Sequence, residues 1–122
     1  MKLLIIDDAD AVRLRLADVL GEIDGLEVDS CAPRAGGIIQ RIQEMRPDIV
    51  VIDIGMQDGA LDLVRTIKSV SHPPVVIALS GSSSIQYRAA CHSAGAEYFF
   101  DKDREQARMV EAITELQLEL AC

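Results

Sequence analysis

The sequence predicts an α/β fold: one five-stranded parallel sheet of order 2-1-3-4-5, doubly wound so that five helices cover both of its faces. Three observations lead to this prediction. Apolar runs of strand length alternate five times with segments of helical period. Most of these runs are continuously apolar, as in strands buried between two helical layers. No linker or low-complexity stretch interrupts the 122 residues, so they are expected to form one domain, residues 1–122.

Five apolar runs are predicted to be strands. In chain order they are KLLII (2–6), LEVDSC (26–31), DIVVID (48–53), PVVIAL (74–79) and EYFF (97–100). A strand followed by a helix, repeated along the chain, predicts parallel strands joined by right-handed crossovers.

The segments after these strands carry apolar residues at helical spacing. They predict helices over residues 10–21, 33–46, 60–70, 83–94 and 104–120. At the start of the first helix, Asp8 or Asp10 is the candidate N-cap. The second helix begins with Pro33, which suits a first turn. Gly36 and Gly37 weaken that turn.

The last two helices differ in the strength of their apolar pattern. The fourth is weak, with a small apolar face made of Ala89, Ala90 and Ala94, and Gly95 is expected to end it. The fifth is the longest. Its inward face is predicted to contain Met109, Val110, Ile113, Leu116 and Leu120.

Composition excludes several classes of function. The net charge is −8, from 12 basic and 20 acidic side chains, and it repels phosphate backbones, so no nucleic-acid partner is expected. No apolar run approaches 18 residues and no signal-peptide pattern follows Met1, so no membrane insertion is expected. Cys31, Cys91 and Cys122 show no metal-ligand spacing and indicate reduced thiols of a cytoplasmic protein.

Polar side chains follow four of the five predicted strands. Asp7 and Asp8 follow the first, Asp53 ends the third, Ser80 follows the fourth, and Lys102 follows the fifth. In open α/β sheets, ligands bind beyond the carboxyl ends of the strands. With the order 2-1-3-4-5 these four ends are adjacent. We therefore expect the five side chains to meet in one pocket.

Three carboxylates in one pocket require a cation. Each like-charge pair at about 5 Å costs about 3 kcal/mol at an effective dielectric constant of about 20. Lys102 supplies one positive charge, and Mg²⁺, which takes a few carboxylates, a carbonyl and several waters, would supply the rest. Asp7, Asp8 and Asp53 are thus predicted metal ligands. Such a site suits phosphoryl transfer, with Asp53 as the nucleophile and with Lys102 and Ser80 binding phosphoryl oxygens.

The aspartates at 7–8, Asp53, Ser80 and Lys102, with GAEYFFDK (95–102), resemble the receiver (phosphoacceptor) domain of two-component response regulators, a flavodoxin-like fold. The resemblance covers essentially the whole chain. It implies a phosphoprotein of signal transduction that accepts phosphate on Asp53 from a sensor histidine kinase or a histidine phosphotransfer protein of a phosphorelay. Mg²⁺ would be its cofactor. It would not be an enzyme beyond catalysing its own phosphorylation and dephosphorylation.

The same resemblance implies details of the site and of a switch. Asp8 would bind Mg²⁺ directly, Asp7 largely through water, and Gly55 through its backbone carbonyl. Ser80 would move toward the phosphate while Phe99 swings inward. The signal would pass to a protein target through the face formed by the fourth helix, fifth strand and fifth helix, and a homodimer is also allowed.

Two departures from the family pattern concern the rim of the site. Asp103 follows Lys102 where the family usually has proline, often after a cis bond. Because a cis bond without proline costs about 3–4 kcal/mol, a trans bond is expected. The loop at 56–61 has Gln57 where proline is common and is one residue shorter than usual.

Two other interpretations remain open from the residues. The run LLIIDDADAV also resembles the first motif of haloacid-dehalogenase-like phosphatases, in which Asp8 would be the nucleophile. That interpretation leaves Asp53 without a role and lacks a further acidic pair after Lys102. The other alternative is a receiver-like binding module that signals without phosphate.

Overall fold

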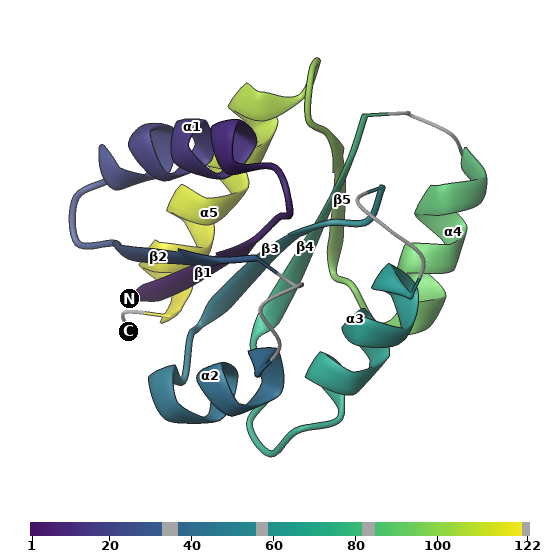
Figure 1. Ribbon diagram of the computed structural model, residues 1–122. Coiled ribbons are helices and arrows are strands. Elements are labelled where there is room, and N and C mark those ends of the chain that lie inside the picture. Colours follow the sequence, from purple (N-terminus) through teal and green to yellow (C-terminus); the bar gives the residue numbers. More distant parts are fainter. Residues whose placement is uncertain (33–36, 56–58, 82–84, 121–122) are drawn as a thin grey trace.

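The computed structural model describes residues 1–32, 37–55, 59–81 and 85–120, and it confirms the predicted alternation of strands and helices (Figure 1). The elements are β1 (Lys2–Ile6), α1 (Asp10–Gly21), β2 (Glu27–Cys31), α2 (Ile38–Met45), β3 (Ile49–Asp53), α3 (Ala60–Lys68), β4 (Val75–Ser80), α4 (Ile85–Ala94), β5 (Tyr98–Asp101) and α5 (Gln106–Leu120). None of the helices in these ranges is long and apolar enough to cross a membrane.

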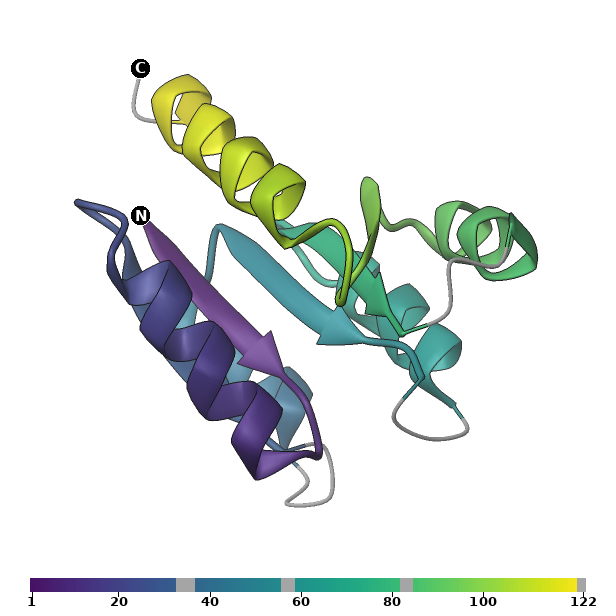
Figure 2. The same ribbon diagram turned by 90° about the horizontal axis from the view of Figure 1, so that it is seen from above.

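The strands form one parallel sheet in the predicted order β2-β1-β3-β4-β5. Figure 2 shows the strand arrows pointing the same way. In the register, Ile52 lies opposite Ile6 on one side and Ala78 on the other, and Ser80 lies opposite Asp101. Each strand begins and ends within one residue of its prediction, because a continuous apolar run marks a strand buried on both faces.

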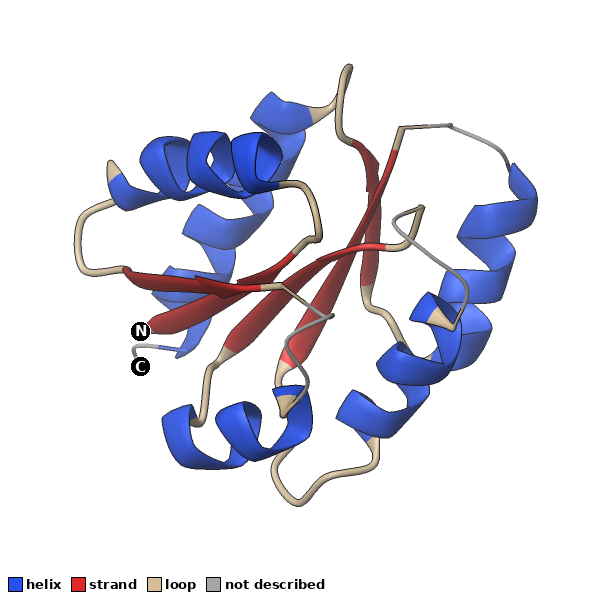
Figure 3. Cartoon of the chain, viewed as in Figure 1, coloured by secondary structure: helices blue, strands red, loops and turns tan. Residues whose placement is uncertain are grey.

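Helices cover both faces of the sheet (Figure 3). Leu3 and Ile5 of β1 face α1 and α5, while Leu4 and Ile6 face the side covered by α2, α3 and α4. This double cover leaves every residue of β3 buried, from Ile49 to Asp53. The acidic end of the central strand therefore lies at the edge of the apolar core.

The predicted N-cap of α1 is wrong. The N-cap position is Ala9, and no side chain caps the helix. Asp10 is the first helical residue, with a side chain 81% exposed and ion-paired to Arg13. The aspartate that bonds to the backbone here is Asp7, whose Oδ1 accepts a hydrogen bond from the Ala9 N–H at 2.8 Å.

The predicted start of the second helix is also wrong. The helix α2 begins at Ile38, directly after Gly37, whose φ of +69° lies in the left-handed region. That conformation interrupts helical backbone, so Gly37 sets the start of α2. Pro33 itself and the expected first turn at 33–36 lie outside the described residues.

Two predicted apolar faces need correction. Among residues 87–94 of α4, Ala89 is exposed and the buried positions are Cys91 and Ala94, which pack in the same core cluster as Phe99. On α5, Leu120 is 50% exposed, because the helix continues one turn past Leu116, the last α5 residue in the core. The weak apolar pattern of α4 left its buried face undetermined.

We expect Gly95→Ala to lower the free energy of unfolding by about 1–2 kcal/mol. Gly95 ends α4 with a φ of +113°, and a Cβ there would lie 2.9 Å from the Cγ of Lys68. Gly21→Ala is the matched control, since no atom lies within 4 Å of its Cβ position in α1. It should stabilise the protein by about 0.5–1 kcal/mol. Urea unfolding measures both changes, and a stabilising Gly95→Ala would contradict the prediction.

Candidate functional site

The carboxyl ends of β1, β3, β4 and β5 bring polar side chains to one edge of the sheet. Asp7 follows β1, Asp53 and Ser80 are the last residues of β3 and β4, and Lys102 follows β5. Asp53, Ser80 and Lys102 line one open pocket together with Gly55. All of these residues except Gly55 and Lys102 are at most 4% exposed.

Asp53 and Lys102 form the central ion pair of the site. The Lys102 Nζ lies 2.7 Å from the Asp53 Oδ2, and the Asp53 Oδ1 accepts a hydrogen bond from the Gly55 N–H at 2.9 Å. The backbone N–H of Lys102 donates to the Ser80 carbonyl at 3.0 Å, which fixes the end of β5 beside β4. A Cβ at Gly81 would lie 3.2 Å from the Lys102 Cε, so glycine leaves room for the lysine chain.

Asp7 is the most buried acid of the site, at 2% exposure. Its Oδ1 accepts the Ala9 N–H, whereas its Oδ2 is buried without a hydrogen-bond partner among the described residues. Burial raises the pKa of Asp7, and the nearby charge of Asp53 raises it further, while the bond from Ala9 opposes the shift. Asp8 is half-buried beside it. A charged Asp7 therefore requires a cation.

The donor set fits an open magnesium site rather than a closed cage. The predicted donors are the three carboxylates of Asp7, Asp8 and Asp53, of which Asp53 is paired with the Lys102 ammonium. Across the described ranges, no three His, Cys, Asp or Glu side chains are grouped as a preformed metal site. Mg²⁺ needs only one or two carboxylates and keeps several waters. The unpartnered Asp7 Oδ2 is the oxygen that such an ion would satisfy.

Sequence reasoning missed two residues at the rim of the pocket. Arg65 of α3 and Tyr87 of α4 line the same pocket as Asp53. Arg65 is ion-paired to Asp62 at 2.6 Å, and Tyr87 is 49% exposed. Both lie on the polar faces of their helices. The sequence predicts these helices only from the apolar residues on their other faces, so it does not single out either side chain. The expected shortened loop around Gln57 lies outside the described residues.

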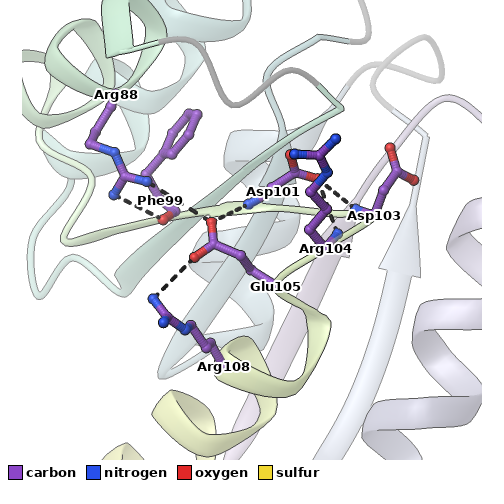
Figure 4. Close-up of polar contacts among 7 residues, drawn as sticks. All are labelled: Arg88, Phe99, Asp101, Asp103, Arg104, Glu105 and Arg108. Atoms are coloured by element: carbon purple, nitrogen blue, oxygen red, sulfur yellow. Dashed lines mark hydrogen bonds and ion pairs between the residues drawn. The ribbon is translucent and has the colours of Figure 1, made fainter.

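The turn after β5 places Lys102. The Oδ1 of Asp101 accepts the N–H groups of Asp103 and Arg104 at 2.8 and 3.1 Å, and the Oε1 of Glu105 accepts the Asp101 N–H at 3.0 Å (Figure 4). No peptide bond in the described chain is cis, so the bond from Lys102 to Asp103 is trans, as expected. The side-chain carboxylates of Asp101 and Glu105, which accept backbone N–H groups, thus shape this turn without proline.

Phe99 lies inside the core, at 3% exposure. The guanidinium of Arg88 lies over its ring, 4.9 Å from the centroid. The Phe99 ring is thus buried beneath Arg88 in this structure. The contact with Arg88 could not be predicted from the sequence, because it depends on how α4 packs against β5.

The Lys102 ammonium is expected to remain protonated above the usual range of lysine. Its hydrogen bond with Asp53 raises the pKa of Lys102 from 10.5. The stability from this pair is therefore fully present below pH 10.5 and is lost as pH rises through the folded-state pKa. An NMR titration of the Lys102 Nζ should give a higher pKa in the wild type than in Asp53→Asn. Equal values would contradict the pairing.

The comparisons with known proteins agree on one family. A family model described as "Response regulator receiver domain" matches residues 3–114. The response regulator GacA of Pseudomonas syringae pv. syringae is 32% identical over 115 residues, which cover 93% of this chain and 53% of that protein. The chemotaxis protein CheY of Thermotoga maritima is 28% identical, with 94% of this chain and 96% of that protein covered. The chain spans about half the length of GacA.

Solved structures share the fold. A LuxR-family two-component response regulator from Aurantimonas sp. SI85-9A1 matches with a TM-score of 0.85 and 23% identity, covering 97% of this chain and 85% of that one. The signal receiver domain of a DNA-binding response regulator from Colwellia psychrerythraea 34H matches with a TM-score of 0.83 and 21% identity, covering 95% of this chain and 97% of that one.

Proposed function

This chain belongs to the response regulator receiver domain family, and from that membership we propose that Asp53 is its phosphoacceptor. The single observation that carries the assignment is the buried Asp53 carboxylate held by Lys102 at 2.7 Å, at the end of the central strand. Asp53 is the only one of the three site carboxylates that lines the open pocket. It is therefore the acid that an incoming phosphoryl group can reach.

The proposed reaction transfers a phosphoryl group from a phosphohistidine. A carboxylate oxygen of Asp53 attacks phosphorus, the P–N bond breaks, and the imidazole leaves with its electron pair and takes up a proton. Lys102 occupies the Asp53 Oδ2 before the reaction, so its ammonium moves from that oxygen to a phosphoryl oxygen. Ser80 binds a second phosphoryl oxygen. The chain catalyses only this reaction and the hydrolysis of its own acyl phosphate.

Asp7, Asp8, Asp53 and the Gly55 carbonyl are the proposed ligands of Mg²⁺. The ion supplies positive charge that offsets the carboxylates and the phosphoryl oxygens in the transition state. The buried Asp7 Oδ2 without a partner in the described chain supports this assignment. Receiver domains generally bind Mg²⁺ at the phosphorylation site, which agrees with the donor set.

We propose a sensor histidine kinase or histidine phosphotransfer protein as the phosphodonor, since receiver domains interact with such kinases and with downstream targets. The target would dock on the face formed by α4, β5 and α5, where a homodimer could also form. Ser80 and Phe99 would be the switch residues, since Ser80 ends β4 and lines the pocket and Phe99 lies in the neighbouring strand β5. A cytoplasmic location fits the free thiols of Cys31 and Cys91.

Labelling with acetyl phosphate, with and without Mg²⁺, tests this function. The proposal expects Mg²⁺-dependent acyl phosphate on the peptide that contains Asp53, located by mass spectrometry. Label on Asp8 would instead support the phosphatase alternative. No label, with partner binding intact, would support the phosphate-independent module. The comparisons favour neither alternative.

A further inference from the structure

Arg88 connects three elements next to the site. From α4, its guanidinium lies 4.9 Å from the centroid of the Phe99 ring in β5. Its Nη1 donates to the Phe99 carbonyl at 3.5 Å, and its Nη2 lies 3.9 Å from the Glu105 Oε1 just before α5 (Figure 4). One side chain thus contacts the ring, the β5 backbone and the acid that begins the next helix.

Glu105 connects Arg88 to the turn that contains Lys102. The same Oε1 that approaches Arg88 accepts the Asp101 N–H at 3.0 Å, and the Glu105 N–H donates to the Asp101 carbonyl at 2.8 Å. Asp101 and Glu105 therefore bracket Lys102 with reciprocal bonds. The Glu105 side chain is only 21% exposed, and the hydrogen bond that its carboxylate accepts from the Asp101 N–H is charge-assisted, whereas Arg88 approaches the same oxygen as an ion-pair partner at 3.9 Å.

We propose that Arg88 is a positioning residue of the phosphoacceptor site. It acts through Glu105 and the Asp101 backbone to hold the Lys102 turn, and through the Phe99 ring to hold α4 against β5. This inference rests on the proposed function, because the Lys102 that it positions is the group that receives the phosphoryl oxygen. Displacement of α4 changes the placement of Lys102, and the coupling is reciprocal.

The position of the metal ligands makes it possible to distinguish a positioning role of Arg88 from a general loss of stability. Asp7 and Asp8 follow β1, and two strands, β3 and β4, separate β1 from β5 in the sheet. The metal ligand next to Lys102 is Asp53, and its carboxylate is also held by the Gly55 N–H, which does not depend on Arg88. Loss of Arg88 should therefore leave the Mg²⁺ affinity unchanged while it lowers the rate of the chemical step. A variant that merely loosens the fold would weaken both.

The test compares Arg88→Met with Arg108→Met. Both arginines approach Glu105, Arg108 at 3.4 Å, but only Arg88 covers Phe99. Arg88→Met should lower the maximal rate of acetyl phosphate labelling about three- to fivefold at saturating Mg²⁺, the size expected for one cation–π contact. Its Mg²⁺ Kd should stay unchanged. Arg88→Lys, which keeps a cation over the ring, should recover part of the rate, and Arg108→Met should stay within about twofold of the wild type.

NMR of the unphosphorylated proteins gives a second readout. Arg88→Met should shift the Phe99 ring signals and the Lys102 amide, whereas Arg108→Met should leave both in place. Equal rates and equal spectra for the two methionine variants would overturn the inference. If wild-type protein takes no label at Asp53, the proposed function fails, and the spectra still decide whether Arg88 holds the Lys102 turn.

Discussion

Asp53→Asn is expected to abolish Mg²⁺-dependent labelling by acetyl phosphate. An amide lacks the negative oxygen that attacks phosphorus, so incorporation should fall to background, at least about a thousandfold, as when other catalytic nucleophiles are removed. The amide oxygen still accepts the Gly55 N–H, which preserves the local backbone. Incorporation of radioactive phosphate, followed by peptide mapping, measures the effect.

Asp48→Asn is the matched control for Asp53→Asn. Asp48 precedes the opposite end of the same strand, where its Oδ2 accepts the Lys2 N–H at 2.9 Å, and an amide oxygen can keep that bond. This variant should be labelled at the wild-type rate. Persistent labelling of Asp53→Asn, or labelling that moves to Asp8, would reject Asp53 as the phosphoacceptor.

The sheet could be predicted from the sequence because burial on both faces leaves a continuous apolar run. Ile49 to Ile52 are all fully buried, and no other class of segment explains four consecutive β-branched residues ending in an acid. The first residues of the helices were harder to predict from the sequence. The left-handed conformation of Gly37 and the bond from the Ala9 N–H to Asp7 are local turn features, which the apolar periodicity used to predict the helices does not report.

The sequence predicts those residues of the candidate site that lie at the ends of strands. Parallel strands place Asp53, Ser80 and Lys102 at one edge whatever the loops do. The contacts of Arg88 and Glu105 were not predictable, since they depend on the turn at 101–105 and on the distance between α4 and α5. These side chains carry no motif, and only their geometry relates them to the phosphoacceptor.

The charge of Asp7 connects this site to the stability of the fold. Because its pKa is raised in the folded protein, Asp7 contributes stability below pH 3.8 that is lost as pH rises through the folded-state pKa. Ionisation of the buried Asp7 carboxyl therefore costs stability in the metal-free protein. A cation at the unpartnered Asp7 Oδ2 removes that destabilisation.

Asp7→Asn is accordingly expected to stabilise the metal-free protein at pH 7 by about 1–2 kcal/mol, because the neutral amide keeps the acceptor for Ala9 and removes the buried charge. It should also lose most of the stabilisation that Mg²⁺ gives the wild type, about 2.7 kcal/mol at a concentration of 100 times Kd. Urea unfolding with and without Mg²⁺ measures both changes. Asp8→Asn, at a more exposed position, should lose the Mg²⁺ response with a smaller gain in metal-free stability. If Asp7→Asn leaves the metal-free stability unchanged and the Mg²⁺ response intact, Asp7 belongs to the core of the protein and not to its metal site.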